Sequence, residues 1–334
     1  MKNKILISSV AMLLVVLVPL GAGHSKPYYE GKTFTFVVST KPGGGYDFYG
    51  RLGAKFMEKY LPGSTIIIRN IPGAGHIIGV NHLYHCKPDG LTFGLFDRGL
   101  YVSQVVGLKG IKFDLAKMSW IGSFASEPRV FLVAKHTPYK TLDDVVKSDR
   151  PVTFACHGIG EMQYMEAMVV AKILGAKNWK PMTGYAGGEG ELAMMRGELA
   201  ASSGSWASMR PFIESGEGRA VMFTSETPVK GYEDVPLLPK VVGKEYKPVV
   251  DLMLFLVRFN RPVAGPPGIP TARLQILREA FKKALHDPEL LKMVEKARRP
   301  IDYIGGEEAE KLIKVVLDQP PEIVKLLKEA YGVK

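Results

Sequence analysis

Two glycine-rich loops are the segments of this sequence whose residue types could bind an anion. Gly43-Gly44-Gly45 follows the apolar run TFTFVVS, and Gly73-Ala74-Gly75 follows TIIIRN. A helical pattern comes after each loop, so we expect the glycines to let backbone N–H groups converge at a helix N-terminus. The helix dipole favours an anion there, and a carboxylate fits as well as a phosphate. After the first loop, we expect Asp47 to lie in the first helical turn and to pair with Arg51 one turn later.

A nucleotide is a less suitable ligand for either loop. No GxxxxGK[ST] motif occurs in the chain, so the lysine and hydroxyl that bind phosphates and Mg²⁺ are missing. Gly73-Ala74-Gly75, with Gly79 four residues on and Asp97 after a later strand, does imitate a dinucleotide-binding fingerprint. Pro72 stiffens that turn, and the export signal described below implies little contact with NAD. A dinucleotide-dependent enzyme using this loop stays an alternative that nothing else in the sequence favours.

Metal-ligating and nucleophilic residues are few. His82, His85 and Cys86 share one face of a helical pattern, at positions i, i+3 and i+4. Such a face could hold a metal, but no fourth ligand is evident, and a free cysteine is commonly buried as a small hydrophobic residue. Cys156 and His157 are adjacent in sequence, which does not place a base against a thiol. HExxH, GxSxG and CxxC motifs are absent, so the sequence predicts no catalytic residue, no metal site and no cofactor.

The beginning of the chain has the layout of a secretory signal. Two lysines precede the apolar run from Ile5 to Leu20, and small residues follow. Cleavage is expected after Gly23 or Ser25, and the lack of a cysteine there argues against a lipoprotein. A retained membrane anchor is the alternative, but the run is short for a span of about 20 residues. We therefore expect an exported protein, periplasmic or extracytoplasmic, and soluble after cleavage.

Composition and patterning indicate the broad class of the protein. The chain has 334 residues and a formal net charge of +11, with Lys and Arg interspersed among acids as in EAFKKALHDPELLKMVEKARR. That interspersion is typical of solvated helix faces, so no nucleic-acid partner is expected. Apolar runs such as FTFVV, TIIIRN, RVFLVA and VTFACH alternate with helical patterns, and the chain is helical from Thr271 onward. The alternation predicts an α/β protein with mainly parallel sheets, and the length predicts two domains.

The order of the motifs resembles the solute receptors of tripartite tricarboxylate transporters, the Bug-type receptors. Residues 42–96 carry a PGG-x-x-D loop, an N-x-PGAG-x-x-x-G loop and a PDG-L-T turn, in the order typical of that family. The likeness continues with TPYKTLDDVV, GYAGGEGELAMMRGELAASSGS, IESGEGRAVMFTSETP and PPGIPTARLQILREAFKKAL. Each motif is weak alone, but together their order and spacing are specific and extend over essentially the whole chain that follows the signal.

This resemblance implies a type II periplasmic binding protein, in which two α/β lobes are joined by two crossing strands. Residues 1–25 would be the signal, residues 26–123 plus 256–334 lobe 1, and residues 124–255 lobe 2. Such a receptor is a monomer and not an enzyme, and it closes over a small organic acid and delivers it to membrane permease subunits. A periplasmic ligand sensor for a signalling kinase is the alternative. Because Cys86 and Cys156 would lie in different lobes, where a crosslink would restrict closure, they are predicted to be unpaired.

The resemblance also implies which residues contact the ligand. Receptors of this family bind a carboxylate largely through backbone amides and water, from the glycine loop of the first lobe and a facing loop of the second. By position, the ligand-binding residues would be Gly43, Gly44, Gly45, Tyr46, Asp47, Ala74, Gly75, His157, Gly158, Ile159, Gly160, Glu161, Met162, Ala186, Gly187, Gly188, Ser203, Gly204, Ser205 and Trp206.

Four departures from the family pattern concern charge. Ile71 replaces an arginine common before PGAG, Glu161 stands where Ser or Thr is usual, and Glu189 follows the second-lobe glycines. The segment Ser203-Gly204-Ser205 stands where relatives often have an aspartate. The pocket is therefore expected to have lost a cation and gained acids, although Glu189 is expected to face solvent. Because a carboxylate repels an anionic ligand once water is excluded, Glu161 favours amino-bearing or hydroxylated carboxylates over simple dicarboxylates.

Overall fold

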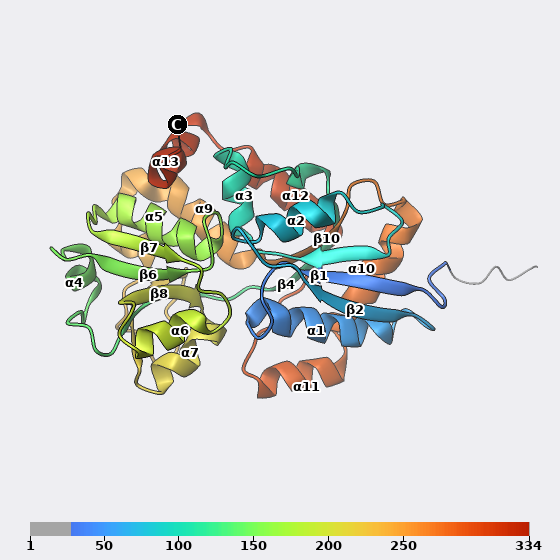
Figure 1. Ribbon diagram of the computed structural model, residues 1–334, viewed down its shortest axis with the longest axis horizontal. Helices are drawn as coiled ribbons and strands as arrows, with labels where there is room; N and C mark the ends of the chain where they lie inside the picture. Colours follow the sequence, from blue (N-terminus) through green and yellow to red (C-terminus); the bar gives the residue numbers. More distant parts are fainter. Residues whose placement is uncertain (1–27, 334) are drawn as a thin grey trace, which may run out of the picture.

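The computed structural model describes residues 28–333, so the predicted signal segment lies outside the described residues. The described chain forms two α/β lobes side by side, each built on one sheet (Figure 1). The two-lobe α/β architecture expected from the sequence is therefore confirmed. In this part of the chain, no helix is long and apolar enough to cross a bilayer.

The first lobe is built on a six-stranded sheet. Its strands are β1 (Thr33–Val38), β2 (Thr65–Asn70), β3 (Thr92–Leu95), β4 (Ser119–Ala125), β10 (Asn260–Gly265) and β11 (Ile304–Gly305), in the order β11-β4-β10-β3-β1-β2. The accompanying helices are α1 (Gly45–Glu58), α2 (Ile77–Tyr84), α3 (Gly99–Val105), α10 (Thr271–Leu285), α11 (Pro288–Lys296) and α12 (Gly306–Leu317).

The second lobe is built on a five-stranded sheet. Its strands are β5 (Arg129–Ala134), β6 (Val152–Cys156), β7 (Trp179–Thr183), β8 (Ala201–Ser205) and β9 (Gly218–Thr224), in the order β7-β6-β8-β5-β9. The accompanying helices are α4 (Leu142–Val146), α5 (Met162–Leu174), α6 (Glu189–Met195), α7 (Trp206–Glu214), α8 (Leu238–Val241) and α9 (Lys247–Arg258).

Both sheets are mixed, so the prediction of mainly parallel sheets is wrong. Parallel pairing is confined to β1 with β2 and β3, and to β6 with β7 and β8. The strands next to the lobe crossings, β4, β5 and β10, pair antiparallel with their neighbours. The chain leaves the first lobe from β4, enters the second lobe at β5 and returns to the first at β10, without a helical crossover on the same sheet. Parallel neighbours need such a crossover, whereas antiparallel ones do not.

The chain crosses between the lobes twice. The first crossing is the short segment between β4 and β5, and the second is Phe259, between α9 and β10. The ring of Phe259 lies 5.7 Å from that of Tyr101 and 5.8 Å from that of Trp120, measured between centroids. Large buried aromatic rings contribute strongly to packing, so this cluster fixes the second crossing against the first lobe.

Helix α1 lies close against its sheet because glycines face the sheet. A Cβ atom on Gly50 would lie 2.6 Å from a methyl carbon of Val38, so only glycine fits at this contact. At the start of the helix, Asp47 accepts a 3.0 Å hydrogen bond from the backbone N–H of Gly43 and a 2.9 Å bond from Nε of Arg51. The predicted role of Asp47 in the first turn, paired with Arg51, is confirmed, and it holds the glycine loop in place.

The last helix, α13 (Pro321–Tyr331), returns to the second lobe (Figure 1). Although residues 256–334 were assigned to lobe 1 by resemblance, α13 packs on α5. The rings of Tyr331 and Tyr164 lie 5.6 Å apart, and Lys172 forms a 3.0 Å ion pair with Glu329. The apolar face of α13 is buried by this contact, which favours the docking.

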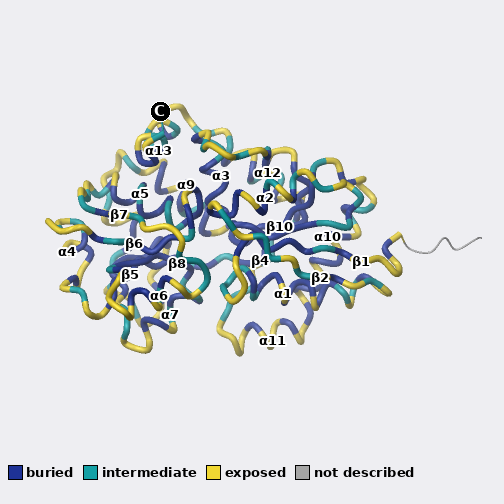
Figure 2. Tube along the Cα trace, in the orientation of Figure 1, coloured by how far each residue is buried: buried dark blue, intermediate teal, exposed yellow. Residues whose placement is uncertain are grey.

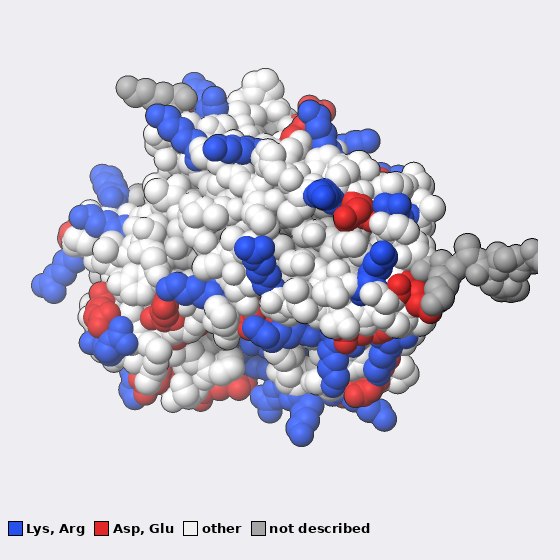
Figure 3. Space-filling model, turned by 45° about the vertical axis from the view of Figure 1, so that its right-hand side comes forward, with Lys and Arg blue, Asp and Glu red and all other residues white. Residues whose placement is uncertain are grey.

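Buried residues lie inside each lobe, and charged residues are dispersed over the surface. Buried residues concentrate along the strands and on the helix faces turned toward the sheets (Figure 2). On the face seen in Figure 3, Lys and Arg side chains are spread out and mixed with Asp and Glu. The positive net charge is therefore distributed over that face.

Candidate functional site

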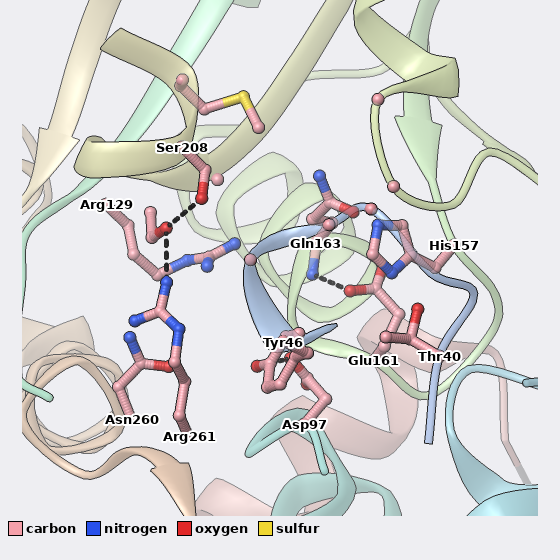
Figure 4. A pocket seen from close by; sticks show the side chains of 18 of the residues that line it. Thr40, Tyr46, Asp97, Arg129, His157, Glu161, Gln163, Ser208, Asn260 and Arg261 are labelled. Carbon is pink, nitrogen blue, oxygen red and sulfur yellow. Dashed lines mark hydrogen bonds between the residues drawn. The ribbon is translucent and has the colours of Figure 1, made fainter. Parts of the chain in front are cut away.

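A cavity of about 220 Å³ lies between the two lobes (Figure 4). Strands β1, β3, β6 and β8 all end beside it, which is where open α/β sheets usually bind ligands. The residues that line the cavity are Thr40, Gly43, Gly44, Gly45, Tyr46, Asp97, Arg129, His157, Glu161, Gln163, Gly187, Gly188, Glu191, Gly204, Ser205, Ser208, Met209, Asn260, Arg261 and Arg299.

The loop before α1 meets the second lobe through its backbone. Gly44 is the N-cap of α1, and a Cβ atom on it would lie 3.2 Å from Cα of Gly187. A Cβ atom on Gly45 would lie 3.0 Å from Oγ of Ser208. Larger residues at these positions would push the lobes apart or fill the cavity, so glycine is needed for a closed arrangement.

The second glycine loop forms a contact between the lobes instead of a wall of the cavity. A Cβ atom on Gly158 would lie 2.5 Å from the backbone nitrogen of Gly75, and one on Gly75 would lie 2.6 Å from the carbonyl oxygen of Ile159. Ser103 donates a 2.6 Å hydrogen bond to the carbonyl of Gly160. The backbone of the loop at Gly75 therefore touches that of the loop at residues 158–160, and this contact holds the lobes in register.

The residues expected to bind the ligand divide between the cavity and its surroundings. Those lining the cavity are Gly43, Gly44, Gly45, Tyr46, His157, Glu161, Gly187, Gly188, Gly204 and Ser205. Those outside its wall are Asp47, Ala74, Gly75, Gly158, Ile159, Gly160, Met162, Ala186, Ser203 and Trp206. Trp206 instead packs its ring against Phe223 and Tyr232, at centroid distances of 5.4 and 4.9 Å.

Three arginines of the cavity were not singled out from the sequence. Arg129 begins β5 and Arg261 lies in β10, so both follow a lobe crossing, and Arg299 follows α11. In the sequence, Arg129 and Arg261 stand out as charged residues within the apolar runs RVFLVA and NRPVAG, which could have indicated a functional role. No comparable feature of the sequence distinguishes Arg299. The predicted loss of a cation concerned position 71 alone, and distant segments supply these three side chains to the cavity.

Buried carboxylates hold two of these arginines in place. Arg129 donates from Nε and Nη2 to Glu166, at 2.7 and 2.6 Å. Arg261 forms an ion pair with Glu127, which lies in the first crossing, and donates a 3.0 Å hydrogen bond to Oγ of Ser205. Charge-assisted pairs of this kind are strong and directional, so both guanidinium groups are fixed relative to the cavity.

Arg299 is held differently. Its Nη1 donates a 3.2 Å hydrogen bond to Oγ of Ser208, and no ion pair joins it to a carboxylate within residues 28–333. Its guanidinium lies 4.8 Å from the ring centre of Phe48. Burial, together with the nearby charge of Arg261, lowers the pKa of Arg299. An anion placed beside Arg299 would favour its charged form and so offset both effects on the pKa.

Asp97 connects the lobes beside the cavity. Its Oδ1 accepts hydrogen bonds from the backbone N–H groups of Gly99, at 2.6 Å, and of Met162, at 2.8 Å. Its Oδ2 accepts a bond from the hydroxyl of Tyr46. Burial works against ionisation, but nearby positive charges and the tyrosine hydroxyl outweigh it and lower the pKa of Asp97. The side chain is therefore a buried carboxylate shared by the two lobes.

Glu161 is the N-cap of α5 and lines the cavity. Its side chain accepts hydrogen bonds from the backbone N–H groups of Gln163, at 2.8 Å, and Tyr164, at 2.9 Å. Burial, and then the charge of Asp97, raise the pKa of Glu161 to about 8. At neutral pH Asp97 is therefore ionised and Glu161 protonated.

Glu189 lies at the outer edge of the cleft. Its side chain is 46% exposed and forms a 2.9 Å ion pair with Lys41 of the first lobe. The expectation that Glu189 faces solvent agrees with this exposure, and Glu189 does not line the cavity. Its pair with Lys41 joins the lobes where solvent screens the charges.

A histidine pair lies across the lobe interface. The rings of His76 and His157 are nearly parallel, with centroids 6.1 Å apart. Burial, and then the repulsion that two protonated rings would exert on each other, lower the pKa of His157 to about 4. Burial also lowers the pKa of His76, whose ring nitrogens have no hydrogen-bond partner in the described chain. Both rings are therefore neutral at physiological pH.

The remaining candidates from the sequence lie away from the cavity. The thiol of Cys86 donates to the carbonyl of His82, at 3.3 Å, and both Cys86 and Cys156 are free thiols. Over residues 28–333, no group of three or more His, Cys, Asp or Glu side chains is arranged to hold a metal.

Comparison with known sequences identifies relatives over most of the chain. A family model described as the tripartite tricarboxylate transporter family receptor matches residues 50–328. A UPF0065 protein of Bordetella pertussis is 23% identical over 286 residues, which is 84% of each chain. The protein BugT of the same organism is 23% identical over 245 residues, or 70% of this chain and 73% of BugT.

Solved structures share the fold. The periplasmic binding protein BugD superposes with a TM-score of 0.77 at 20% identity, covering 92% of this chain and 99% of BugD. MatC of Rhodopseudomonas palustris, solved with bound malate, gives a TM-score of 0.74 at 19% identity, covering 89% and 99% of the two chains. An R. palustris protein solved with adipate gives 0.69 at 16% identity, covering 90% and 98%. The expected periplasmic binding protein fold is confirmed.

Proposed function

The chain belongs to the family of tripartite tricarboxylate transporter receptors, and we propose that it is the extracytoplasmic receptor of such a transporter. In this role it captures a small organic acid between its lobes and delivers it to the permease in the membrane. It binds its ligand without changing it chemically. The expected export signal is consistent with this location.

The observation that carries the proposal is the cavity between the lobes. It is small, it is bordered by both sheets, and Arg129, Arg261 and Arg299 line it. Such a set of guanidinium groups in an enclosed space favours an anionic ligand, because charge attraction strengthens as water is excluded. A volume of about 220 Å³ suits a small acid rather than a nucleotide or peptide.

Relatives of known structure support an acid as the ligand. MatC was solved with malate and a second R. palustris protein with adipate, and both share this fold. We infer a ligand of the same broad class here. We propose that the residues of the cavity wall bind the ligand. The glycine loops let the two lobes come close enough to close over it.

Closure of the lobes is the step that would couple binding to transport. The contacts that join the lobes, at Asp97 with Met162 and at Lys41 with Glu189, form only when the lobes are together. A permease that recognises the closed shape would then distinguish the loaded receptor from the empty one. The ligand contributes by adding contacts that only the closed arrangement provides.

A thermal-shift screen with small organic acids tests the proposal. We expect at least one acid to raise the melting temperature of the purified protein, because binding to the folded state alone stabilises it. Isothermal titration calorimetry would then give the affinity. A comparison of uptake of that acid by cells with and without the receptor would test delivery. If no acid binds, the proposed function is wrong.

A further inference from the structure

The first turn of α5 is already occupied by the protein's own carboxyl groups. Asp97 accepts the N–H of Met162, and Glu161 accepts the N–H groups of Gln163 and Tyr164. The loop before α5 is packed on the first lobe. A ligand carboxylate placed here would find no free donor in this turn and would meet the negative charge of Asp97.

The opposite side of the cavity has the reverse character. Figure 4 shows Arg261 and Ser208 on one side, and Glu161 and His157 on the other. On the arginine side, hydrogen bonds run from Arg261 to Ser205, at 3.0 Å, and between Ser205 and Ser208, at 3.1 Å.

Arg299 joins this arginine side. A Cβ atom on Gly45 would lie 3.5 Å from both Nη2 of Arg261 and Nη1 of Arg299, so both guanidinium groups reach the first turn of α1. Arg261 is neutralised by Glu127, but Arg299 forms no ion pair with any carboxylate in the described part of the chain. This side therefore carries a positive charge that the protein itself leaves unbalanced.

On the other side, Gln163 provides an acceptor that lacks a donor. Its Nε2 donates to the carbonyl of Ser203, which leaves Oε1 pointing away from that bond. Oε1 is buried, and no donor reaches it among residues 28–333. Because an unsatisfied buried acceptor is costly, a ligand that supplies a donor here would be favoured.

We propose that the ligand is an acid whose carboxylate binds Arg299, Arg261 and Ser208, and whose distal hydroxyl or amino group donates to Oε1 of Gln163. This inference rests on the proposed function and specifies the ligand class and its orientation. It places the anion beside α1 and the arginines and not on the first turn of α5. It also disfavours simple dicarboxylates, because the second carboxylate would approach Asp97.

Calorimetry with a matched series of acids tests the orientation. Butanoate, 4-hydroxybutanoate, 4-aminobutanoate and succinate differ only at the distal group, and homologues one carbon shorter and longer adjust the length. We expect the hydroxy or amino acid of the best length to bind more tightly than the unsubstituted acid and the dicarboxylate. The variants are Arg299→Met and Gln163→Met, with Lys296→Met as control, since Lys296 is exposed at the end of α11.

The two ends of the ligand site, at Arg299 and at Gln163, should respond separately to mutation. Arg299→Met should weaken every acid that binds, by about tenfold to a hundredfold for the loss of a charged hydrogen bond. Gln163→Met should remove the preference for the hydroxy or amino acid and leave the affinity for the unsubstituted acid unchanged. Lys296→Met should change neither. A crystal structure of wild-type protein with the tightest acid provides a readout that does not depend on the variants folding.

The outcomes separate the two proposals. If wild-type protein binds none of these or other acids, the proposed function fails. If acids bind but Arg299→Met folds and leaves affinity unchanged, only the orientation is wrong. The orientation is also overturned if the dicarboxylate binds most tightly, or if the crystal structure shows the carboxylate on the N–H groups of α5.

Discussion

The side chain of Asp97 and the backbone N–H of Met162 form a 2.8 Å hydrogen bond between the two lobes. Asp97 follows β3 in the first lobe and Met162 begins α5 in the second. The bond is buried, whereas the ion pair between Lys41 and Glu189 is half-exposed. A charged hydrogen bond that is shielded from solvent contributes more than a screened surface pair, so Asp97 links the lobes more strongly than the pair of Lys41 with Glu189 does.

Replacement of Asp97 tests this link. Asp97→Ala leaves two backbone N–H groups and the Tyr46 hydroxyl without their acceptor, and we expect the free energy of unfolding to fall by about 3 kcal/mol. Urea denaturation measures the change. Glu189→Ala, which removes the exposed pair, is the matched control and should cost less than about 1 kcal/mol. Equal losses for the two variants would show that burial does not set the strength of these contacts.

A side chain at Gly44 should prevent closure. In Gly44→Val the added carbons would meet the backbone of Gly187 in the other lobe, 3.2 Å from the new Cβ atom. The backbone at Gly44 has a φ of −88°, which valine adopts, so the fold should be retained. We expect calorimetry to detect no binding of the acid that best stabilises the wild type, while circular dichroism shows that the variant is folded. Wild-type affinity in a folded variant would contradict the role of this loop.

Glu161 should make the protein less stable as the pH rises. Burial and Asp97 raise the pKa of Glu161 from 4.5 to about 8, so the folded protein holds a proton that the unfolded chain has lost. The stabilisation is present at low pH and is lost as the pH rises toward 8. We expect the free energy of unfolding to fall between pH 6.5 and 8, which lies above the pKa of His157 in the folded protein. Glu161→Gln should flatten this slope, and an equal slope in the variant would assign it to another group.

His157 should act in the acid range with the opposite sign. Burial lowers the pKa of His157 from 6.5 to about 4, so the unfolded chain binds a proton that the folded protein does not. Stability is then lost as the pH falls from 6.5 toward 4. In urea titrations His157→Gln should lose less stability over this range than wild type. His136→Gln, at an exposed histidine, should behave as wild type; if it matches His157→Gln, the interface histidines are not the cause.

The two cysteines should be free and unequal in reactivity. Cys156 is fully buried and burial raises the pKa of its thiol strongly, whereas Cys86 is partly exposed. A thiol reagent such as Ellman's should therefore modify Cys86 in the native protein and Cys156 only after unfolding. In protein that is denatured without prior reduction, both thiols should react with the reagent and give its coloured product. Finding none would mean that a disulfide forms.

Local features of this protein were predictable from the sequence. The glycine loop before α1 and the pair of Asp47 with Arg51 depend on residues a few positions apart, so backbone geometry and helical spacing are enough to place them. The alternation of apolar runs with helical patterns is likewise local, and it determined that the chain forms α/β lobes. The order of the motifs along the chain determined the family.

The cavity's charge was decided only by the tertiary structure. Arg129, Arg261 and Arg299 are far apart in sequence and meet because the chain crosses between the lobes twice. Glu161 was recognisable as an acid in the pocket, but its protonation depends on burial and on Asp97, more than 60 residues earlier. Ionisation and side-chain direction follow from the solvent and charges around a group, and those neighbours are brought together by folding.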